Sequence, residues 1–123
     1  MALLYFFIFL YYNIYIESLE RGCMIKLWIE SVRPAPSGYI WAKSVNEAKT
    51  AIKAYELNYY DDTVIIDIDH DAGDYASDGG DYIRFLDWLE YEGYVDEGFF
   101  FHIHSMNVVG VQNLRAIIEK NGW

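Results

Sequence analysis

The sequence predicts an α/β domain built on a mainly parallel sheet of about four strands. Short strand patterns alternate with helical patterns from residue 24 onward, which is typical of parallel sheets with right-handed crossovers. The chain has 123 residues, 54% of them hydrophobic, so it can bury the core of one domain. The most diagnostic stretch is 63–68, Thr-Val-Ile-Ile-Asp-Ile, which is apolar except for Asp67. Such a run is typical of a strand buried on both faces.

The remaining elements follow from periodicity and capping signals. Ser44 and Glu47 form a capping box, in which the side chain of each is expected to bond to the backbone of the other. Asp78 is expected to cap the helix that follows it, and Gly110 to begin the last helix. The predicted strands cover residues 24–30, 39–42, 63–68 and 99–103, and the predicted helices run from about 45 to 57, 81 to 91 and 110 to 121.

Residues 1–23 form an apolar N-terminal extension, separate from a domain over residues 24–123. Residues 1–16 are slightly too few for a comfortable membrane span, and they lack the basic start and cleavage site of a signal peptide. Three interpretations stay open. The translation start is mis-assigned and Met24 is the true first residue, the segment anchors a domain that faces the cytoplasm, or it forms a buried or interfacial helix.

Charge and cysteine content limit the partners. The formal net charge of −10 argues against extended binding to nucleic-acid backbones, which needs clustered Lys and Arg, but allows a small phosphate ligand or an RNA end. Cys23 is the single cysteine, so no internal disulfide can form and a cytoplasmic location is expected. Contact with a membrane is expected only if residues 1–16 are a genuine anchor.

Polar residues follow three of the predicted strands. The carboxyl ends of parallel strands share one edge of the sheet, where ligands of open α/β sheets bind. We therefore expect these loop residues to converge at one site. They are Glu30 and Arg33 after the first strand, Asp69, His70 and Asp71 after the third, and His104, Ser105 and Asn107 after the fourth.

Two histidines at this edge are suited to acid–base chemistry. Cleavage of a cyclic phosphodiester needs a base that activates water and an acid that protonates the leaving alkoxide, and imidazole titrates near working pH. We interpret His70 and His104 as this pair, with a loop-bracing hydrogen bond as the alternative for either one. His102 lies on the same strand face as His104, and we interpret it as structural.

The other polar residues have alternative roles. Arg33 offers a planar fork for two phosphate oxygens, or a salt bridge to Glu30 or Asp71. Ser105 and Asn107 are expected either to donate hydrogen bonds to a phosphate or to cap their loop.

The carboxylates are interpreted as catalytic groups or as metal ligands. Asp69 is a candidate nucleophile or metal ligand, and Asp71 is expected to orient His70 or to share the metal. The candidate cofactor is a divalent metal such as Mg²⁺, for which Glu30, Asp69 and Asp71 are the candidate ligands.

The ordered set of these stretches resembles the cyclic-phosphate processing receiver domains. That family has an acidic pair and Val-Arg-Pro after the first strand, Asp-His-Asp-x-Gly after the central strand, a Gly-Tyr-Asp-type helix start, and His-Ser-x-Asn after the fourth strand. The resemblance covers residues 24–123 and implies a receiver-like, flavodoxin-like three-layer sandwich with a role on cyclic phosphates. The matching stretches are Glu30-Ser-Val-Arg-Pro, Asp69-His-Asp-Ala-Gly73, Gly80-Asp-Tyr82 and His104-Ser-Met-Asn107.

The sequence departs from the family pattern at two positions. Ser31 replaces the second acid of the pair, which weakens metal binding if that acid holds an ion, and Asp67 is an unusual acid inside a strand. By the resemblance, Asp69 stands where a receiver accepts its phosphate. An orthodox phospho-signalling receiver is not expected, because the pattern has no fifth strand ending in lysine and because His70 adjoins the aspartate.

The predicted function is that of a phosphoesterase acting on a cyclic phosphate, either an RNA terminal cyclic phosphate or a cyclic nucleotide. The alternative is a non-catalytic receiver-like module that binds a phosphate ligand or a partner protein, which the serine at position 31 favours. Both interpretations require the strands at 25–30 and 63–68 to be central neighbours, because otherwise Arg33 could not face Asp69.

Overall fold

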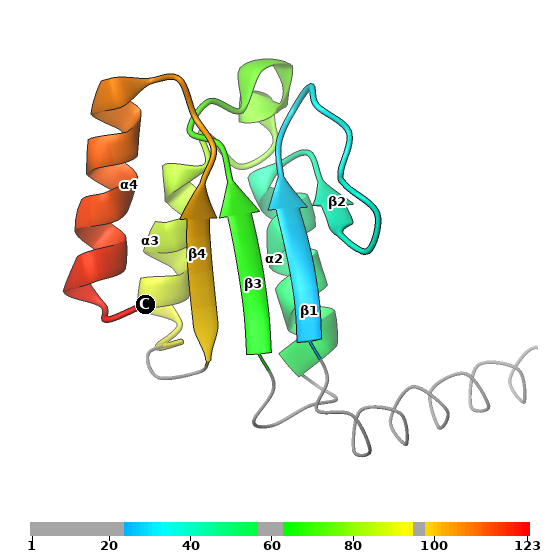
Figure 1. Ribbon diagram of the computed structural model, residues 1–123, viewed down its shortest axis with the longest axis vertical. Helices are drawn as coiled ribbons and strands as arrows, with labels where there is room; N and C mark the ends of the chain where they lie inside the picture. The colour runs from blue at the N-terminus through cyan, green and yellow to red at the C-terminus, as the bar shows by residue number, and fades with distance from the viewer. Residues whose placement is uncertain (1–23, 57–62, 95–97) are drawn as a thin grey trace, which may run out of the picture.

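The computed structural model describes residues 24–56, 63–94 and 98–123 (Figure 1). Four strands form one sheet in the order β2-β1-β3-β4, and every neighbouring pair is parallel. The strands are β1 (Met24–Ile29), β2 (Ile40–Ala42), β3 (Thr63–Ile68) and β4 (Phe99–Ile103). The helices are α2 (Val45–Glu56), α3 (Ile83–Tyr91) and α4 (Val108–Lys120), with a short 3-10 helix η1 (Gly73–Ser77).

The central pairing of β1 and β3 is confirmed. Ile29 lies opposite Ile68, so Glu30 and Asp69 leave the sheet side by side. Hydrogen bonding continues beyond the strand ends, because the Asp69 N–H donates to Ile29 O at 3.0 Å and the His104 N–H donates to Ile68 O at 2.9 Å. All four strands end at the top of Figure 1, where η1 also lies. The three loops that carry the predicted site therefore start from one edge.

One face of the sheet forms the core. Figure 1 shows α2 and α3 behind the sheet, and apolar residues of all three α-helices join the strands in a single cluster. In β3, Val64, Ile66 and Ile68 are buried, whereas Thr63, Ile65 and Asp67 are only partly buried. The prediction that this strand is buried on both faces is therefore wrong for the described structure, because no described helix covers the second face. Asp67 belongs to this less covered face.

Capping explains two differences from the predicted helix starts. The Asn107 carboxamide oxygen accepts from the Gly110 N–H at 2.9 Å, so Asn107 is the N-cap and α4 begins two residues before Gly110. Asp78 does not cap α3, which begins at Ile83. The Asp78 carboxylate instead accepts from Ser44 Oγ at 2.6 Å and from Asn46 Nδ2 at 3.0 Å, which ties the segment after η1 to the start of α2.

Half of the predicted capping box is present. The Glu47 N–H donates to Ser44 Oγ at 3.1 Å, as predicted. The Glu47 carboxylate accepts from the Lys43 N–H at 2.6 Å rather than from the Ser44 N–H.

The N-terminal extension at residues 1–23 and the predicted helix end near residue 57 lie outside the described residues. Within the described ranges, no helix is long and apolar enough to cross a membrane. The cytoplasmic location stays a prediction.

Candidate active site at the carboxyl edge of the sheet

Glu30, the first residue after β1, is the most buried charged group at the site, with 2% of its surface exposed. One carboxylate oxygen accepts from the Val32 N–H at 2.7 Å, and the other accepts from Arg33 Nε at 3.0 Å. Burial is the largest influence on its pKa and raises it, but the Val32 and Arg33 hydrogen bonds and the Arg33 charge together outweigh burial and lower the pKa. Glu30 is therefore held as a carboxylate, paired with Arg33.

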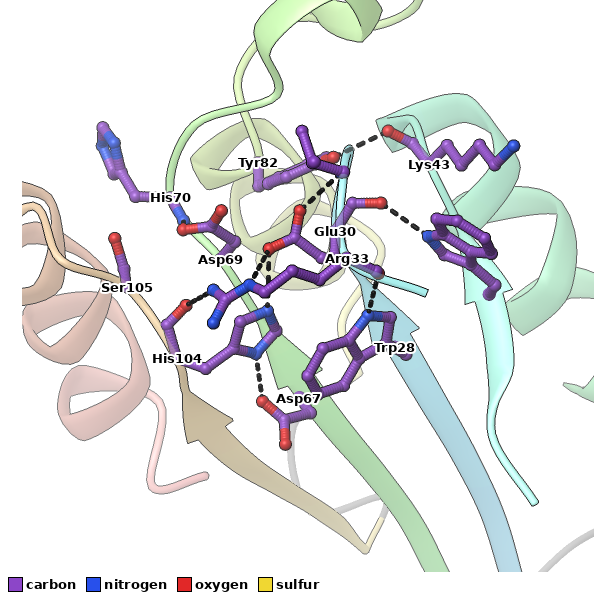
Figure 2. A network of polar contacts seen from close by, with 12 residues as sticks. Trp28, Glu30, Arg33, Lys43, Asp67, Asp69, His70, Tyr82, His104 and Ser105 are labelled. Carbon is purple, nitrogen blue, oxygen red and sulfur yellow. Dashed lines mark hydrogen bonds and ion pairs between the residues drawn. The ribbon is translucent and has the colours of Figure 1, made fainter. Parts of the chain in front are cut away.

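Arg33 connects two of the site loops. It forms the predicted salt bridge to Glu30, and its Nη2 donates to His104 O in the loop after β4 at 3.3 Å. Its side chain is still 58% exposed, so the guanidinium lies at the surface of the site rather than beneath it. Figure 2 shows the guanidinium next to the His104 imidazole. Arg33 can thus receive a ligand from solvent while it remains fixed by Glu30.

The His104 imidazole is held at one nitrogen and on one face. Its Nδ1 bonds to Asp67 Oδ1, and its ring stacks on Trp28 with centroids 4.0 Å apart and planes 5° from parallel (Figure 2). Its Nε2 lies 3.6 Å from Glu30 Oε1, beyond hydrogen-bond distance. Within the described part of the chain, Nε2 is a buried atom with no hydrogen-bond partner. Because buried polar atoms are nearly always satisfied, this nitrogen lacks a partner that its environment would normally supply, and it is the candidate atom of the site for a ligand or a reaction.

Asp67 is an acid that the sequence prediction noted inside the strand but did not place among the site residues. It lies opposite Trp28 of β1 and opposite His102 of β4 in the sheet register. Its Oδ1 contacts Nδ1 of His104 and, at 3.1 Å, Nδ1 of His102. The signal was present in the sequence, since a carboxylate inside an apolar strand needs a partner and two histidines follow on one face of the next strand.

His70 belongs to a separate arrangement. Its Nδ1 lies 2.8 Å from Asp71 Oδ1 and 3.4 Å from Asn107 Nδ2. The ring packs directly on Gly110 at the start of α4, where a Cβ would lie 2.3 Å from His70 Cγ. In Figure 2 the His70 side chain points away from His104. The structure thus brings Asp71 and Asn107 to His70, and brings Glu30, Arg33 and Asp67 to His104.

The residues between these two groups are mostly engaged in loop capping. Asp69 Oδ1 accepts from the His70 N–H at 2.7 Å, and Figure 2 shows the Asp69 carboxylate between Glu30 and His70. Ser105 Oγ accepts from the Asn107 N–H at 3.2 Å. The described contacts of Ser105 are therefore those of the capping alternative, and its hydroxyl hydrogen remains a possible donor.

Tyr82 connects the loop after β3 to the segment that precedes α2. Its hydroxyl donates to Lys43 O at 2.7 Å, and its N–H donates to His70 O at 3.3 Å. Burial raises the pKa of the Tyr82 phenol well above its ordinary value, and the negative charges of Glu30 and Asp69 raise it further. The phenol therefore stays neutral.

The predicted metal ligands Glu30 and Asp71 are engaged in other contacts. Both oxygens of Glu30 accept hydrogen bonds from Val32 and Arg33, and Asp71 is turned toward His70. Across residues 24–56, 63–94 and 98–123, no group of three or more His, Cys, Asp or Glu side chains is arranged to hold a metal ion. The metal stays a prediction.

Comparison with known proteins supports the fold and the family. The family model described as the cyclic-phosphate processing receiver domain matches residues 25–120. No curated protein and no solved structure matches the chain. The parallel sheet with its alternating helices agrees with the receiver-like, flavodoxin-type fold that the sequence predicts. Since the match spans most of its length, the chain belongs to the cyclic-phosphate processing receiver domain family.

Proposed function

We propose that the protein is a phosphoesterase that opens a cyclic phosphate, either at an RNA terminus or in a cyclic nucleotide. The observation that carries this proposal is the environment of His104. Its ring is fixed, its Nε2 is buried without a hydrogen-bond partner among the described residues, and the Arg33 guanidinium bonds to its backbone oxygen. A general base beside an exposed arginine fits an anionic ester, and the family's association with cyclic phosphates agrees with that chemistry.

In the proposed reaction, Arg33 binds the phosphate oxygens and His104 acts as the base. Arginine suits this role because its planar fork matches two phosphate oxygens, and Glu30 keeps the fork in place. Neutral His104 takes a proton from water through Nε2 as the water oxygen bonds to phosphorus. The bond between phosphorus and one ring oxygen breaks, and that oxygen leaves as an alkoxide.

The leaving alkoxide needs a proton, and we assign its donor as His70. Asp71 holds this imidazole over the start of α4, and because the leaving oxygen is bonded to the phosphorus at Arg33, His70 would deliver its proton through one bridging water. The proton then passes from His70 to the alkoxide. Ser105, whose hydroxyl hydrogen can donate, is assigned to the phosphate, and Asn107 caps α4 beside His70.

A non-catalytic phosphate-binding module is the second candidate. Ser31 in place of an acid favours it, as does the number of hydrogen bonds that already engage Glu30 and His70. Both candidates share the Arg33 phosphate site, so the experiment must separate binding from turnover.

The test is an assay of the purified full chain against RNA ending in a cyclic phosphate and against 2′,3′- and 3′,5′-cyclic nucleotides, with added Mg²⁺ and with chelator. Turnover of at least one substrate is expected. His104→Ala should reduce kcat at least 100-fold, as expected for the loss of a general base that contributes roughly 10²–10⁴. Arg33→Ala should mainly raise KM.

The matched control is Arg84→Ala, which removes an exposed arginine whose partner is Asp87 on α3 and should leave kcat and KM unchanged. Full turnover by His104→Ala would reject the proposed mechanism. Absence of turnover on every substrate, together with phosphate binding that Arg33→Ala abolishes, would favour the binding module. Loss of activity in chelator would support a metal at the predicted carboxylates.

A further inference from the structure

We propose that Asp67 is a positioning residue that fixes the His104 imidazole with Nε2 as its only reactive nitrogen, an inference that rests on the proposed function. Aspartate is unfavourable inside a strand, and its carboxylate is costly to bury without partners. The Asp67 side chain is only 14% exposed. The imidazoles of His102 in β4 and of His104 directly after β4 are the partners that the structure gives it.

The bond between Asp67 and His104 selects the tautomer. An ionised carboxylate can only accept a hydrogen bond, so Nδ1 of His104 must carry the proton that lies between them. In the neutral ring, Nε2 then has the lone pair. This is the buried nitrogen without a partner in the described chain, and it lies on the side of Glu30 and Arg33. Asp67 thus presents a base to the place where the phosphate is proposed to bind.

Other contacts fix the plane of the ring. The Trp28 indole covers one face of the imidazole, and Trp28 Nε1 is itself fixed by donating to Arg33 O at 2.9 Å. The backbone of His104 is held by Ile68 O at 2.9 Å. Orientation therefore comes from packing, and the choice between the two nitrogens comes from Asp67.

His102 does not share this role. Its side chain is 71% exposed, whereas that of His104 is 10% exposed, although both bond to the same oxygen of Asp67. An exposed imidazole contributes little to holding the carboxylate. His102→Gln should therefore leave the tautomer of His104 unchanged.

The first test is independent of catalysis. Nitrogen-15 NMR of the full chain labelled at histidine distinguishes the two tautomers, and neutral His104 should be protonated at Nδ1. Asp67→Asn should shift His104 toward the other tautomer, because an amide can also donate to Nδ1. The matched control is Asp71→Asn, which makes the same change beside His70 and should alter the signals of His70 only. An unchanged tautomer in Asp67→Asn overturns the proposal.

The second test separates positioning from stability. Asp67→Asn should lower kcat about 100-fold, within the range for acid–base catalysis, and leave KM within about twofold. Asp67→Glu should recover part of kcat, because it restores a carboxylate. Asp87→Asn, the same change at an exposed carboxylate of α3, should leave kcat unchanged. Wild-type turnover in a folded Asp67→Asn protein would overturn the proposal. If the unmutated protein has no turnover, the proposed function fails, and the NMR result still decides the role of Asp67.

Discussion

The imidazole of His104 lies flat on the indole of Trp28, with ring centroids 4.0 Å apart and planes 5° from parallel. The indole nitrogen in turn donates to Arg33 O at 2.9 Å. One tryptophan of β1 therefore contacts both residues that the proposed reaction needs, the base His104 directly after β4 and, through its backbone oxygen, Arg33 in the loop after β1. Stacked aromatic rings stay parallel over a range of offsets. The contact with Trp28 therefore fixes the plane of the imidazole but not how the ring is turned within that plane.

Replacing Trp28 should therefore impair catalysis and stability together. Trp28→Leu removes the stacked ring, and we expect it to lower the free energy of unfolding by about 1–2 kcal/mol, from the lost aromatic contact and partial burial. Trp28→Phe keeps a stacked ring but loses the bond to Arg33 O, so its kcat should lie between those of the wild type and Trp28→Leu. Urea denaturation and steady-state kinetics measure both effects. Equal kcat in the leucine and phenylalanine variants would contradict the role of stacking.

A second prediction concerns the contact between His70 and Gly110. An alanine at position 110 would place its Cβ 2.3 Å from His70 Cγ, closer than any real contact. Gly110→Ala should therefore displace the imidazole and lower the free energy of unfolding by about 1–3 kcal/mol, the usual cost of overpacking. Alanine is otherwise about 1 kcal/mol better than glycine in a helix. A lower free energy of unfolding in Gly110→Ala would therefore show that the clash with His70 outweighs the gain in helix propensity.

The control for Gly110→Ala is the same substitution in a His70→Ala background. With the imidazole gone, the added methyl group has space, and Gly110→Ala should now raise stability by up to about 1 kcal/mol through helix propensity. A double-mutant cycle from thermal or urea unfolding measures this reversal. If Gly110→Ala is equally destabilising in both backgrounds, the ring does not occupy the described position.

Backbone rules explain what could be predicted from the sequence. The alternation of strands and helices, together with right-handed crossovers, is enough to place β1 beside β3 and to bring Glu30, Asp69 and His104 to one edge. The salt bridge between Arg33 and Glu30 was also among the predicted alternatives, because residues three apart after a strand can meet in a tight loop. Such features depend on chain order and spacing alone.

Side-chain direction and strand register could not be read in this way. The row formed by Trp28, Asp67 and His102 exists because β1, β3 and β4 pair in one particular register, which a single sequence does not specify. The position of His70 at the same edge of the sheet as His104 also did not predict the direction in which its side chain points. It lies over α4 because Gly110 leaves space there and Asp71 provides a partner.

The third prediction is a pH-dependent link between η1 and α2. Hydrogen bonds from Ser44 and then from Asn46 lower the pKa of Asp78 from its ordinary value of 3.8. A carboxyl group whose pKa is lowered on folding stabilises the protein above its unfolded pKa, and this contribution disappears as the pH falls through the folded value. Asp78→Asn should thus lower the urea midpoint at pH 7 and leave it nearly unchanged near pH 2. A constant difference across this range would contradict the link.

The last prediction concerns Glu30, whose carboxylate holds Arg33 in place. Glu30→Gln keeps the size of the side chain but removes the charge, and one of its two terminal atoms can no longer accept from Val32 or Arg33. Hydrogen bonds to a buried charge contribute about 2 kcal/mol each, so we expect a loss of that order in the free energy of unfolding at pH 7. Without the Glu30 carboxylate the guanidinium is no longer held in one position, so it should bind phosphate less tightly and KM should rise.

The pH dependence of the free energy of unfolding distinguishes the contribution of the Glu30 charge from that of its packing. Because the pKa of Glu30 is lowered below its ordinary value of 4.5, the wild type should keep its full advantage over Glu30→Gln from pH 7 down to that value. The advantage should then shrink as the pH falls further and the carboxylate takes up a proton. Urea unfolding of both proteins at several pH values between 7 and 2 measures it. A stability difference that persists unchanged at the lowest pH would show that packing, rather than the ion pair with Arg33, is what the glutamine disturbs.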